Sequence, residues 1–505
     1  MENIFGKYDK VIFWLAAIFC GIFVVITMSD PAAMQGYFGN IFSFFTVNLG
    51  WMYLLIASLF LIFCLAMIFS RYGQIKLGKD DEEPEFSRFS WFAMLFAAGM
   101  GIGLVFWGVA EPMYHFAGPP FAEPNTAAAA QEAMRYSFFH WGLHPWATYA
   151  VVALCLAYFQ FRKDKPGLIS STLLPFLGEK GVQGPWGKAV DTLTVVVTLF
   201  GVATSLGLGA LQITTGLDIV AGIPASTTVS VIIIAVITVL FTISAVTGVA
   251  RGIKFLSNTN MVIFFGLMLL MFILGPTRYL LNTFIETLGS YVQNLIWMSF
   301  FTDSQGAVAE HAGWDWVSGW TVFYWAWWIT WAPFVGSFIA RISRGRTIRE
   351  FMVGILLAPS LLCFIWFTIM GGSAINVELF GAGGIVSATF AEVSSAPFAM
   401  FSHFPLSSLL SVGAMITTTI FFITSADSST YVVSMMTSGG DLEPKSGLRI
   451  FWGAVAGAIA AMLLLSGGLE AVQTVAFAFG FPFMLVMVVM IAALLKSFAK
   501  DEKMQ

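Results

Sequence analysis

Long apolar runs recur from one end of the chain to the other. A transmembrane helix needs about 20 predominantly apolar residues, and the sequence contains twelve runs of that kind. We place the predicted spans at residues 11–29, 49–70, 90–115, 137–160, 189–216, 227–250, 257–275, 318–340, 350–372, 404–433, 448–466 and 470–496. The segment 276–301 is amphipathic and too polar to span, so we predict a helix at the membrane interface. The pattern predicts an all-α polytopic membrane protein with 12 transmembrane helices.

The positions of Lys and Arg predict the orientation. When the connections are assigned to alternate sides, 22 of the 24 basic residues fall on one side, and only Arg135 and Arg278 fall on the other. Cytoplasmic loops carry the excess of Lys and Arg in membrane proteins. Both termini are therefore predicted to be cytoplasmic, which requires an even number of spans and agrees with twelve.

The composition excludes several classes of protein. Hydrophobic residues make up 58% of the chain and charged residues 10%, with a mean hydropathy of +0.84, whereas soluble domains are about 25% charged. A soluble enzyme, a disordered chain and a nucleic-acid-binding protein, which would need a basic patch, are thereby excluded. Lys7 and Lys10 precede the first run as in a signal peptide, but the run is too long for one, and we interpret it as a retained span. The four cysteines lie in apolar runs without metal-ligand spacing, so we expect no disulfide framework.

Alternating glycines stand at mid-membrane depth in the third predicted span. Residues 96–104 read FAAGMGIGL, which places Gly99, Gly101 and Gly103 two residues apart. Two interpretations are open. Close helix packing usually has small residues four apart, whereas an unwound turn lets a ligand approach the backbone amides. The two-residue spacing favours the unwound turn.

The eighth predicted span concentrates Trp beside a proline. Residues 323–334 read FYWAWWITWAPF, and Pro333 removes a backbone N–H in the middle of the span. Trp often marks the membrane interface, but this cluster lies near the span centre. We therefore favour a binding role for the cluster.

The fourth predicted span begins with a second aromatic group. On a helix Trp146 and Tyr149 share one face and Trp141 lies partly around it. Taken alone, an interfacial belt is the commoner interpretation of these residues. His140 and His144 are four residues apart, a spacing that suits a metal, but no third ligand is apparent and we expect no metal site.

Hydroxyl side chains crowd the tenth predicted span, where residues 417–430 read TTTIFFITSADSST. Most of these hydroxyls are expected to bond back to the carbonyl four residues earlier. For Thr424 and Ser425, which stand beside an expected helix break, we favour coordination of a hard cation such as Na⁺. Asp427 is an intramembrane carboxylate and therefore a functional candidate.

These features together favour a small zwitterionic ligand. A quaternary ammonium has no N–H to donate, so aromatic ring faces recognise it. Backbone N–H groups or a helix N-terminus would hold the anionic end, and the segment 99–103 offers both. No Lys or Arg lies within the predicted cores of the third, fourth and eighth spans. A cage of Trp rings near helix breaks thus fits a methylated ammonium that carries its own anion.

Four motifs resemble the betaine/carnitine/choline transporter family over essentially the whole chain. They are Met100 with its flanking glycines, YWAWWITWAPFVG, ARISRGRTIREF and FFITSADSSTYVV. The resemblance is strongest to the Na⁺-coupled glycine betaine transporters of bacteria. It implies a single transmembrane domain over 1–505 with a leucine-transporter-like core of two inverted five-helix repeats. The repeats would cover 90–275 and 318–496, with two peripheral helices at 11–70 and the interfacial helix at 276–301. Broken third and eighth spans would be the matching first helices of the two repeats.

The resemblance also implies site residues. The substrate would be held by Trp141, Trp146, Tyr149, Trp327, Trp328, Trp331, Met100, Gly101 and Gly103, and Trp325 and Phe338 would line the pathway. One Na⁺ site would use backbone carbonyls of Ala97 and Met100 together with Phe421, Thr424 and Ser425. A second would use Thr198 near Phe334, although Val202 stands where a second Thr is expected, which leaves the stoichiometry open.

The leading hypothesis is therefore Na⁺-driven uptake of glycine betaine, an osmoprotective compatible solute, by alternating access across a bacterial cell membrane. The resemblance implies a homotrimer with 276–301 as an interface, Na⁺ as coupling ion, no cofactor and no nucleic-acid partner. The alternatives are Na⁺-independent exchange of carnitine-like betaines and choline uptake. Choline-carrying relatives tend to have a carboxylate where Gly103 stands, which favours a zwitterion. An enzyme is not expected because the five His are scattered, and a channel would need rings of like groups.

Overall fold

The computed structural model describes residues 5–99, 101–247 and 250–502, and within these residues its regular secondary structure is helical. The long helices are α2 (Lys10–Ser29), α3 (Pro31–Phe69), α4 (Arg88–Gly99), α5 (Ile102–Ala117), α6 (Ala127–Trp141), α7 (Leu143–Ala157), α10 (Pro185–Ala221), α11 (Thr227–Thr247), α12 (Ala250–Leu274), α13 (Thr277–Phe300), α15 (Phe323–Ile342), α16 (Ile348–Phe380), α19 (Ser407–Thr437), α20 (Ser446–Leu465) and α21 (Leu469–Glu502). Short helices in the connections are α8 (Ile169–Thr172), α9 (Leu174–Gln183), α14 (Ala307–Ala312), α17 (Ile385–Ala391) and α18 (Ala396–Phe401). The predicted all-α class is confirmed.

Nine helices among the described residues are long and apolar enough to cross a membrane. A continuous helix satisfies its own backbone N–H and C=O groups, which is why apolar runs of this length fold as helices in lipid. The three other predicted spans correspond to the pair α4 and α5, to α11, and to the Trp-rich α15. The protein is thus a polytopic membrane protein, while the count of twelve spans and the inverted repeats stay predictions.

Helix breaks occur at two of the predicted spans. The expected break in the third span is confirmed, because α4 ends at Gly99 and α5 begins at Ile102. The expected break in the eighth span is wrong. Here α15 continues through Pro333, preceded by a π-helical turn, Ser318–Val322. The fourth span, predicted as one helix, is instead interrupted at Gly142, whose backbone (φ −96°, ψ −130°) separates α6 from α7. The expected break near Thr424 is also wrong, since α19 is continuous there.

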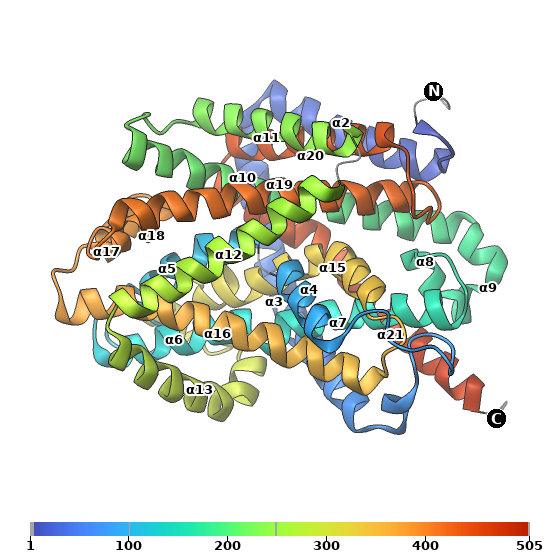
Figure 1. The fold of residues 1–505 in the computed structure, drawn as a ribbon, viewed down its shortest axis with the longest axis horizontal. Helices are drawn as coiled ribbons and strands as arrows, with labels where there is room; N and C mark the ends of the chain where they lie inside the picture. The colour runs from blue at the N-terminus through green and yellow to red at the C-terminus, as the bar shows by residue number, and fades with distance from the viewer. Residues whose placement is uncertain (1–4, 100, 248–249, 503–505) are drawn as a thin grey trace.

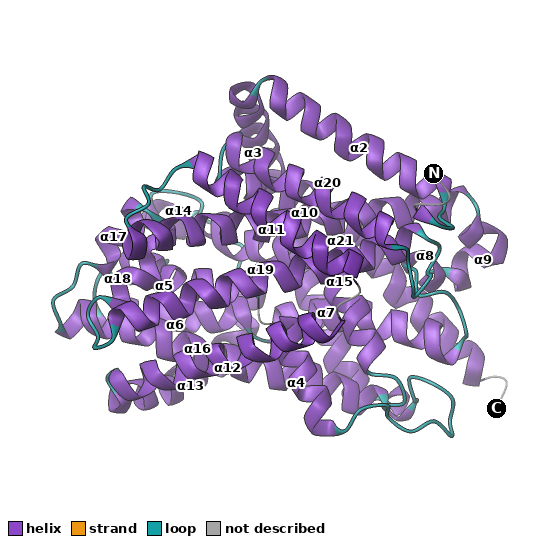
Figure 2. Ribbon diagram, turned by 45° about the horizontal axis from the view of Figure 1, so that its top comes forward, coloured by secondary structure: helices purple, strands orange, loops and turns teal. Residues whose placement is uncertain are grey.

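The two chain ends lie at the same end of the molecule. In Figures 1 and 2, α2 begins and α21 ends on the right. Both ends contact the same connecting segment, because Asp9 pairs with Lys188 at 3.3 Å and Lys496 donates to the carbonyl of Pro175 at 2.7 Å. The predicted even number of crossings stays a prediction.

Ion pairs join three basic connections that the sequence places on one side. Arg344 makes two hydrogen bonds to Glu82, at 3.0 and 2.6 Å. Arg162 lies 2.8 Å from Asp80 and Lys79 lies 2.5 Å from Asp164. The connections after α3, α7 and α15 therefore meet at one face of the protein.

Glycines allow the central helices to approach closely. Along the molecule α2, α11 and α20 lie on one long side and α13 on the other (Figures 1 and 2). Between these two sides of the molecule, α15 packs against α7 and α10. A Cβ on Gly336 would lie 2.7 Å from Val152, and one on Gly201 would lie 2.8 Å from the carbonyl oxygen of Thr330. Small residues at helix crossings are the usual means of close packing in membranes, and here they bring α5, α7, α10 and α15 around one centre.

Candidate functional site

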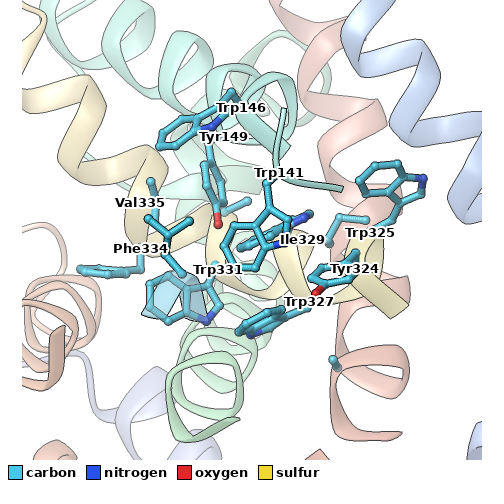
Figure 3. Close-up of a cluster of buried hydrophobic side chains, with 14 of the residues drawn as sticks. Trp141, Trp146, Tyr149, Tyr324, Trp325, Trp327, Ile329, Trp331, Phe334 and Val335 are labelled. Atoms are coloured by element: carbon cyan, nitrogen blue, oxygen red, sulfur yellow. The ribbon is translucent and has the colours of Figure 1, made fainter. Parts of the chain in front are cut away.

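A small aromatic cavity lies where these central helices meet. Its volume is about 20 Å³, and it is lined by Gly101, Gly103, Leu104, Trp141, Tyr149, Ser205, Trp327, Trp328 and Trp331. Five of the six aromatic residues predicted for the substrate box line it. The sixth, Trp146, lies behind Tyr149, with the ring centroids 5.6 Å apart in an edge-on arrangement (Figure 3). The tertiary structure therefore brings together aromatic groups from the fourth and eighth predicted spans.

The rings are held in fixed orientations by their own N–H groups. Nε1 of Trp331 donates to the carbonyl of Gly201 at 2.8 Å, and Nε1 of Trp328 donates to the carbonyl of His140 at 3.0 Å. Trp327 stacks on Trp328 with centroids 4.9 Å apart, and Trp141 stands edge-on to Trp328 at 4.8 Å. Because these protein acceptors occupy two of the indole donors, the cavity meets mainly ring surface, which attracts cations.

The broken third span supplies backbone to the same cavity. Gly101 is extended (φ −138°, ψ −173°) and no side chain caps the start of α5. The first N–H groups of a helix lack intrahelical acceptors, and the helix dipole makes this end positive. Because Gly101, Gly103 and Leu104 all line the cavity, the beginning of α5 is suited to an anionic group. Met100 lies outside the described residues.

Two polar groups in the cavity wall have no protein partner among the described residues. They are the hydroxyl of Ser205 and Nε1 of Trp327, and both are buried. An unpartnered buried polar atom is unfavourable, so these atoms are suited to receive a ligand. Sequence reasoning missed Ser205, because a single Ser on a long apolar helix has no distinguishing local signal.

Trp325 and Phe338, predicted to line the pathway, lie away from the cavity wall. Trp325 is buried and stacks on His144, with centroids 5.0 Å apart, and Figure 3 shows it well separated from Trp331. Phe338 is half-buried on α15. His144 also bonds to Ser299 at 3.1 Å, whereas His140 bonds to Glu111 and Thr321.

One of the residues predicted for the first Na⁺ site, Met100, lies outside the described residues. The backbone of Ala97 belongs to α4, but its surroundings and Met100 are not described. Thr424 donates to the carbonyl of Ile420 at 2.9 Å, the back-bonding expected for most hydroxyls of this helix, and Ser425 is half-buried.

The start of α5 and the middle of α19 do converge. A Cβ on Gly209 of α10 would lie 3.0 Å from Ile102 and 3.2 Å from Phe422. Phe421, the residue before Phe422, is buried. The start of α5, which follows the predicted ligands Ala97 and Met100 in the chain, and the helix α19 therefore both contact α10 at Gly209.

The second predicted Na⁺ site joins α10 and α15. Thr198 is buried and its hydroxyl donates to the carbonyl of Thr194 at 2.8 Å. Phe334 lies edge-on to Trp331, with ring centroids 5.7 Å apart. The phenyl ring of Phe334 is therefore next to a ring that lines the aromatic cavity. Val202 is also buried and offers no oxygen in its side chain.

Asp427, the intramembrane carboxylate noted in the sequence, is paired. Oδ1 of Asp427 lies 2.6 Å from Nη2 of Arg449 on α20. An ion pair at this depth compensates part of the desolvation of both charges. Asp427 thus links α19 to α20 and does not line the aromatic cavity.

A second buried carboxylate, Glu111 on α5, escaped the sequence analysis. Its Oε2 accepts from Nε1 of Trp141 at 2.7 Å and from the hydroxyl of Tyr324 at 2.5 Å. Its Oε1 lies 2.7 Å from Nδ1 of His140 and 3.2 Å from Nε2 of His115. The sequence carried a signal, namely a carboxylate in an apolar helix followed four residues later by His, but the partners from α6 and α15 come only with the fold.

The fold and this cavity define a membrane protein with a small aromatic cavity where its central helices meet. The model of the BCCT, betaine/carnitine/choline family transporter, matches residues 11–503. The chain therefore belongs to the betaine/carnitine/choline transporter family, and it is a multi-pass membrane transporter rather than an enzyme.

Named relatives are similar over nearly their whole length. The glycine betaine transporter OpuD of Bacillus subtilis is 49% identical over 98% of this chain and 96% of its own. A probable glycine betaine transporter of Desulfitobacterium hafniense is 45% identical over 98% of both chains. The ectoine/hydroxyectoine transporter of Virgibacillus pantothenticus is 41% identical over 98% of this chain and 97% of its own.

Proposed function

We propose that this transporter imports glycine betaine, driven by Na⁺, through alternating access. The observation that carries the proposal is the cavity that combines five aromatic side chains with the start of α5. Rings of Trp attract a trimethylammonium group, by up to about 2 kcal/mol for each desolvated contact. The similar relatives named as glycine betaine transporters support the same substrate.

The anionic end of the substrate has a separate set of partners. The N–H groups at the start of α5 and the hydroxyl of Ser205 are placed to receive the carboxylate. None of the described residues that line the cavity is Lys or Arg, so these residues offer no fixed positive charge there. A zwitterion satisfies both ends at once, whereas choline would leave the anion-binding end without a partner.

Alternating access is supported by the small size of the cavity. A cavity needs a volume of roughly 10–15 Å³ to hold a single water molecule. The cavity between these rings has a volume of about 20 Å³. Glycine betaine is several times larger than water, so the rings must move apart for it to enter. Ion pairs such as Arg344–Glu82 close the face that we assign to the cytoplasm, and these pairs would break as that face opens.

Na⁺ coupling is proposed from the convergence of α5 and α19 on α10. In this arrangement the backbone carbonyls of Ala97 and Met100, which precede α5, would hold the first ion together with Phe421, Thr424 and Ser425. The second ion would lie between Thr198 and Phe334. Na⁺ acts as the coupling ion and enters with the substrate, so the transporter needs no bound cofactor.

Uptake in proteoliposomes tests substrate and coupling together. Trp331→Leu removes a ring that lines the cavity and should abolish betaine uptake and betaine-dependent tryptophan quenching. Uptake of labelled betaine by the wild type should follow an inward Na⁺ gradient and fail with K⁺. Uptake that persists without a Na⁺ gradient would favour the alternative, exchange of carnitine-like betaines.

We further propose a homotrimer in the bacterial cell membrane, with both termini in the cytoplasm. The helix α13 packs its inner side on the protein, where Tyr291 is buried. Its outer side exposes Leu281, Ile285, Val292 and Ile296, with Ile296 78% exposed. Such a face is suited to lipid or to a second copy. Native mass spectrometry of the wild type should give trimers, and Ile285→Glu with Ile296→Glu should give monomers.

A further inference from the structure

The carboxylate of Glu111 is bonded to two rings at the edge of the cage. Trp141 lines the cavity, and its indole N–H can only donate, so its contact with Oε2 of Glu111 has a defined direction. Tyr324 stacks on Trp328, another cavity ring, with centroids 5.9 Å apart. Figure 3 places Tyr324 next to Trp327, on the side of the cage away from Trp146. Glu111 therefore contacts the aromatic rings around the cavity without lining the cavity itself.

The arrangement of donors around the carboxyl of Glu111 suits a negatively charged carboxylate. Lengths of 2.7 Å from Trp141 and 2.5 Å from Tyr324 are typical of charge-assisted hydrogen bonds. On the other oxygen, His140 and His115 can each donate one N–H while neutral. The described ion pairs of Glu111 involve only these two His, and neither Lys nor Arg. A buried anion that lacks a permanently charged partner is unfavourable. The ammonium group of a bound substrate would reduce this unfavourable free energy.

We propose that Glu111 is the fixed counter-charge for the ammonium end of the substrate and a positioning residue for Trp141 and Tyr324. This inference rests on the proposed function, because it concerns how the same cavity discriminates between ligands. Glu111 does not line the cavity, so it acts through the rings. A charge in a medium of low dielectric constant is felt over several ångströms, and an indole that donates to an anion offers a more electron-rich face to a cation.

Glu111→Gln separates the charge from the geometry. The amide oxygen can still accept from Trp141 and Tyr324, and the amide NH₂ can donate to His140 and His115 once both imidazoles change tautomer. Thr321, whose hydroxyl lies 2.9 Å from Nε2 of His140, can accept in that arrangement. The substitution thus keeps the size and every hydrogen bond of the cluster, and it removes one negative charge.

The test compares two ligands that differ only in charge. Glycine betaine carries a trimethylammonium group, and 3,3-dimethylbutanoate has a tert-butyl group in its place with the same carboxylate. Binding of each is measured by tryptophan quenching or calorimetry in purified wild type and in Glu111→Gln. We expect the betaine Kd to rise about ten-fold in the variant, while the Kd of the neutral-headed isostere changes by less than about two-fold.

The control is another buried carboxylate, Asp191, which does not line the cavity. Asp191 accepts from the backbone N–H of Ser170 at 2.9 Å and from its hydroxyl at 2.6 Å, and Asp191→Asn should leave the ratio of the two Kd values unchanged. Equal weakening of both ligands in Glu111→Gln, or no change in either, overturns the inference. If instead the wild type does not bind betaine at all, the proposed function fails.

Discussion

Gly103 on α5 lies directly against the indole of Trp327. A Cβ atom on Gly103 would be 2.6 Å from Cη2 of Trp327 and 3.2 Å from Cη2 of Trp141. Carbon atoms do not approach to 2.6 Å without displacement, so only glycine permits this approach of two rings to the backbone. The glycine that the sequence places in an alternating series thus has a specific partner in the cage.

Gly103→Ala should weaken betaine binding by about ten-fold or more, because overpacking of this kind costs about 1–3 kcal/mol. The new methyl group must displace the ring of Trp327 or that of Trp141. Calorimetry with purified protein measures the effect. Gly266→Ala on α12 is the control, since no described atom outside its own helix lies within 4 Å of a Cβ there and the residue does not line the cavity. Equal Kd values for the two variants would contradict the assignment.

Ser205→Ala should reduce affinity for glycine betaine, because it removes a hydroxyl that is buried in the cavity wall and has no protein partner. A hydrogen bond to a charged group contributes about 1.5–3 kcal/mol, so a Kd increase of roughly ten-fold or more follows. The neighbouring Thr204→Val serves as control, because the Thr204 hydroxyl already donates to the carbonyl of Phe200 at 3.0 Å. An unchanged Kd in Ser205→Ala would remove this residue from the site.

Ser425→Ala should raise the Na⁺ concentration needed for half-maximal uptake about ten-fold, since loss of a hydrogen-bonding or ligating oxygen for a charged partner is worth about 1.5 kcal/mol or more. Maximal uptake at saturating Na⁺ should remain close to that of the wild type. Thr419→Ala, on the same helix, is the control, because the Thr419 hydroxyl back-bonds to the carbonyl of Met415 at 2.8 Å. The measurement is initial uptake against Na⁺ at fixed betaine, and identical curves for all three proteins would count against the proposed ion site.

The Arg344–Glu82 pair should stabilise the closed face in a pH-dependent way. Hydrogen bonding to Arg344 lowers the pKa of Glu82 below its usual range. A group whose pKa is lower in the folded protein stabilises the fold above its unfolded pKa of about 4.3, and this contribution disappears as the pH falls through the lowered value. The melting temperature of Glu82→Gln should therefore be slightly below that of the wild type between pH 5 and 8, by a nearly constant amount.

The same difference should shrink below about pH 4, where the unpaired carboxyl would already be protonated. The charge reversal of both residues, Glu82→Arg with Arg344→Glu, should restore stability that each single change loses. A difference between wild type and Glu82→Gln that grows on acidification would have the wrong sign for this pair.

Much of the fold could be predicted from local pattern. Apolar runs of about 20 residues have one solution in lipid, a helix with satisfied backbone, and the long helices accordingly coincide with the predicted spans. The break at Gly99–Gly103 was also predictable, because alternating glycines weaken a helix locally. Pro333 misled the prediction for the eighth span. The preceding π-helical turn and close packing against α7 and α10 accompany a helix that continues through this proline.

The sequence by itself determined the class of protein, the broken third span and most of the aromatic residues of the cage, because hydrophobic length, glycine spacing and Trp content are local properties. Only the tertiary structure decided which groups meet. It separated Trp325 and Trp146 from the cavity wall, and it brought Ser205 into that wall from α10. It also joined Glu111 to Trp141 and Tyr324 across three helices. Such contacts depend on helix rotation and depth, which are set by packing at residues such as Gly201 and Gly336 and leave no periodic trace in the chain.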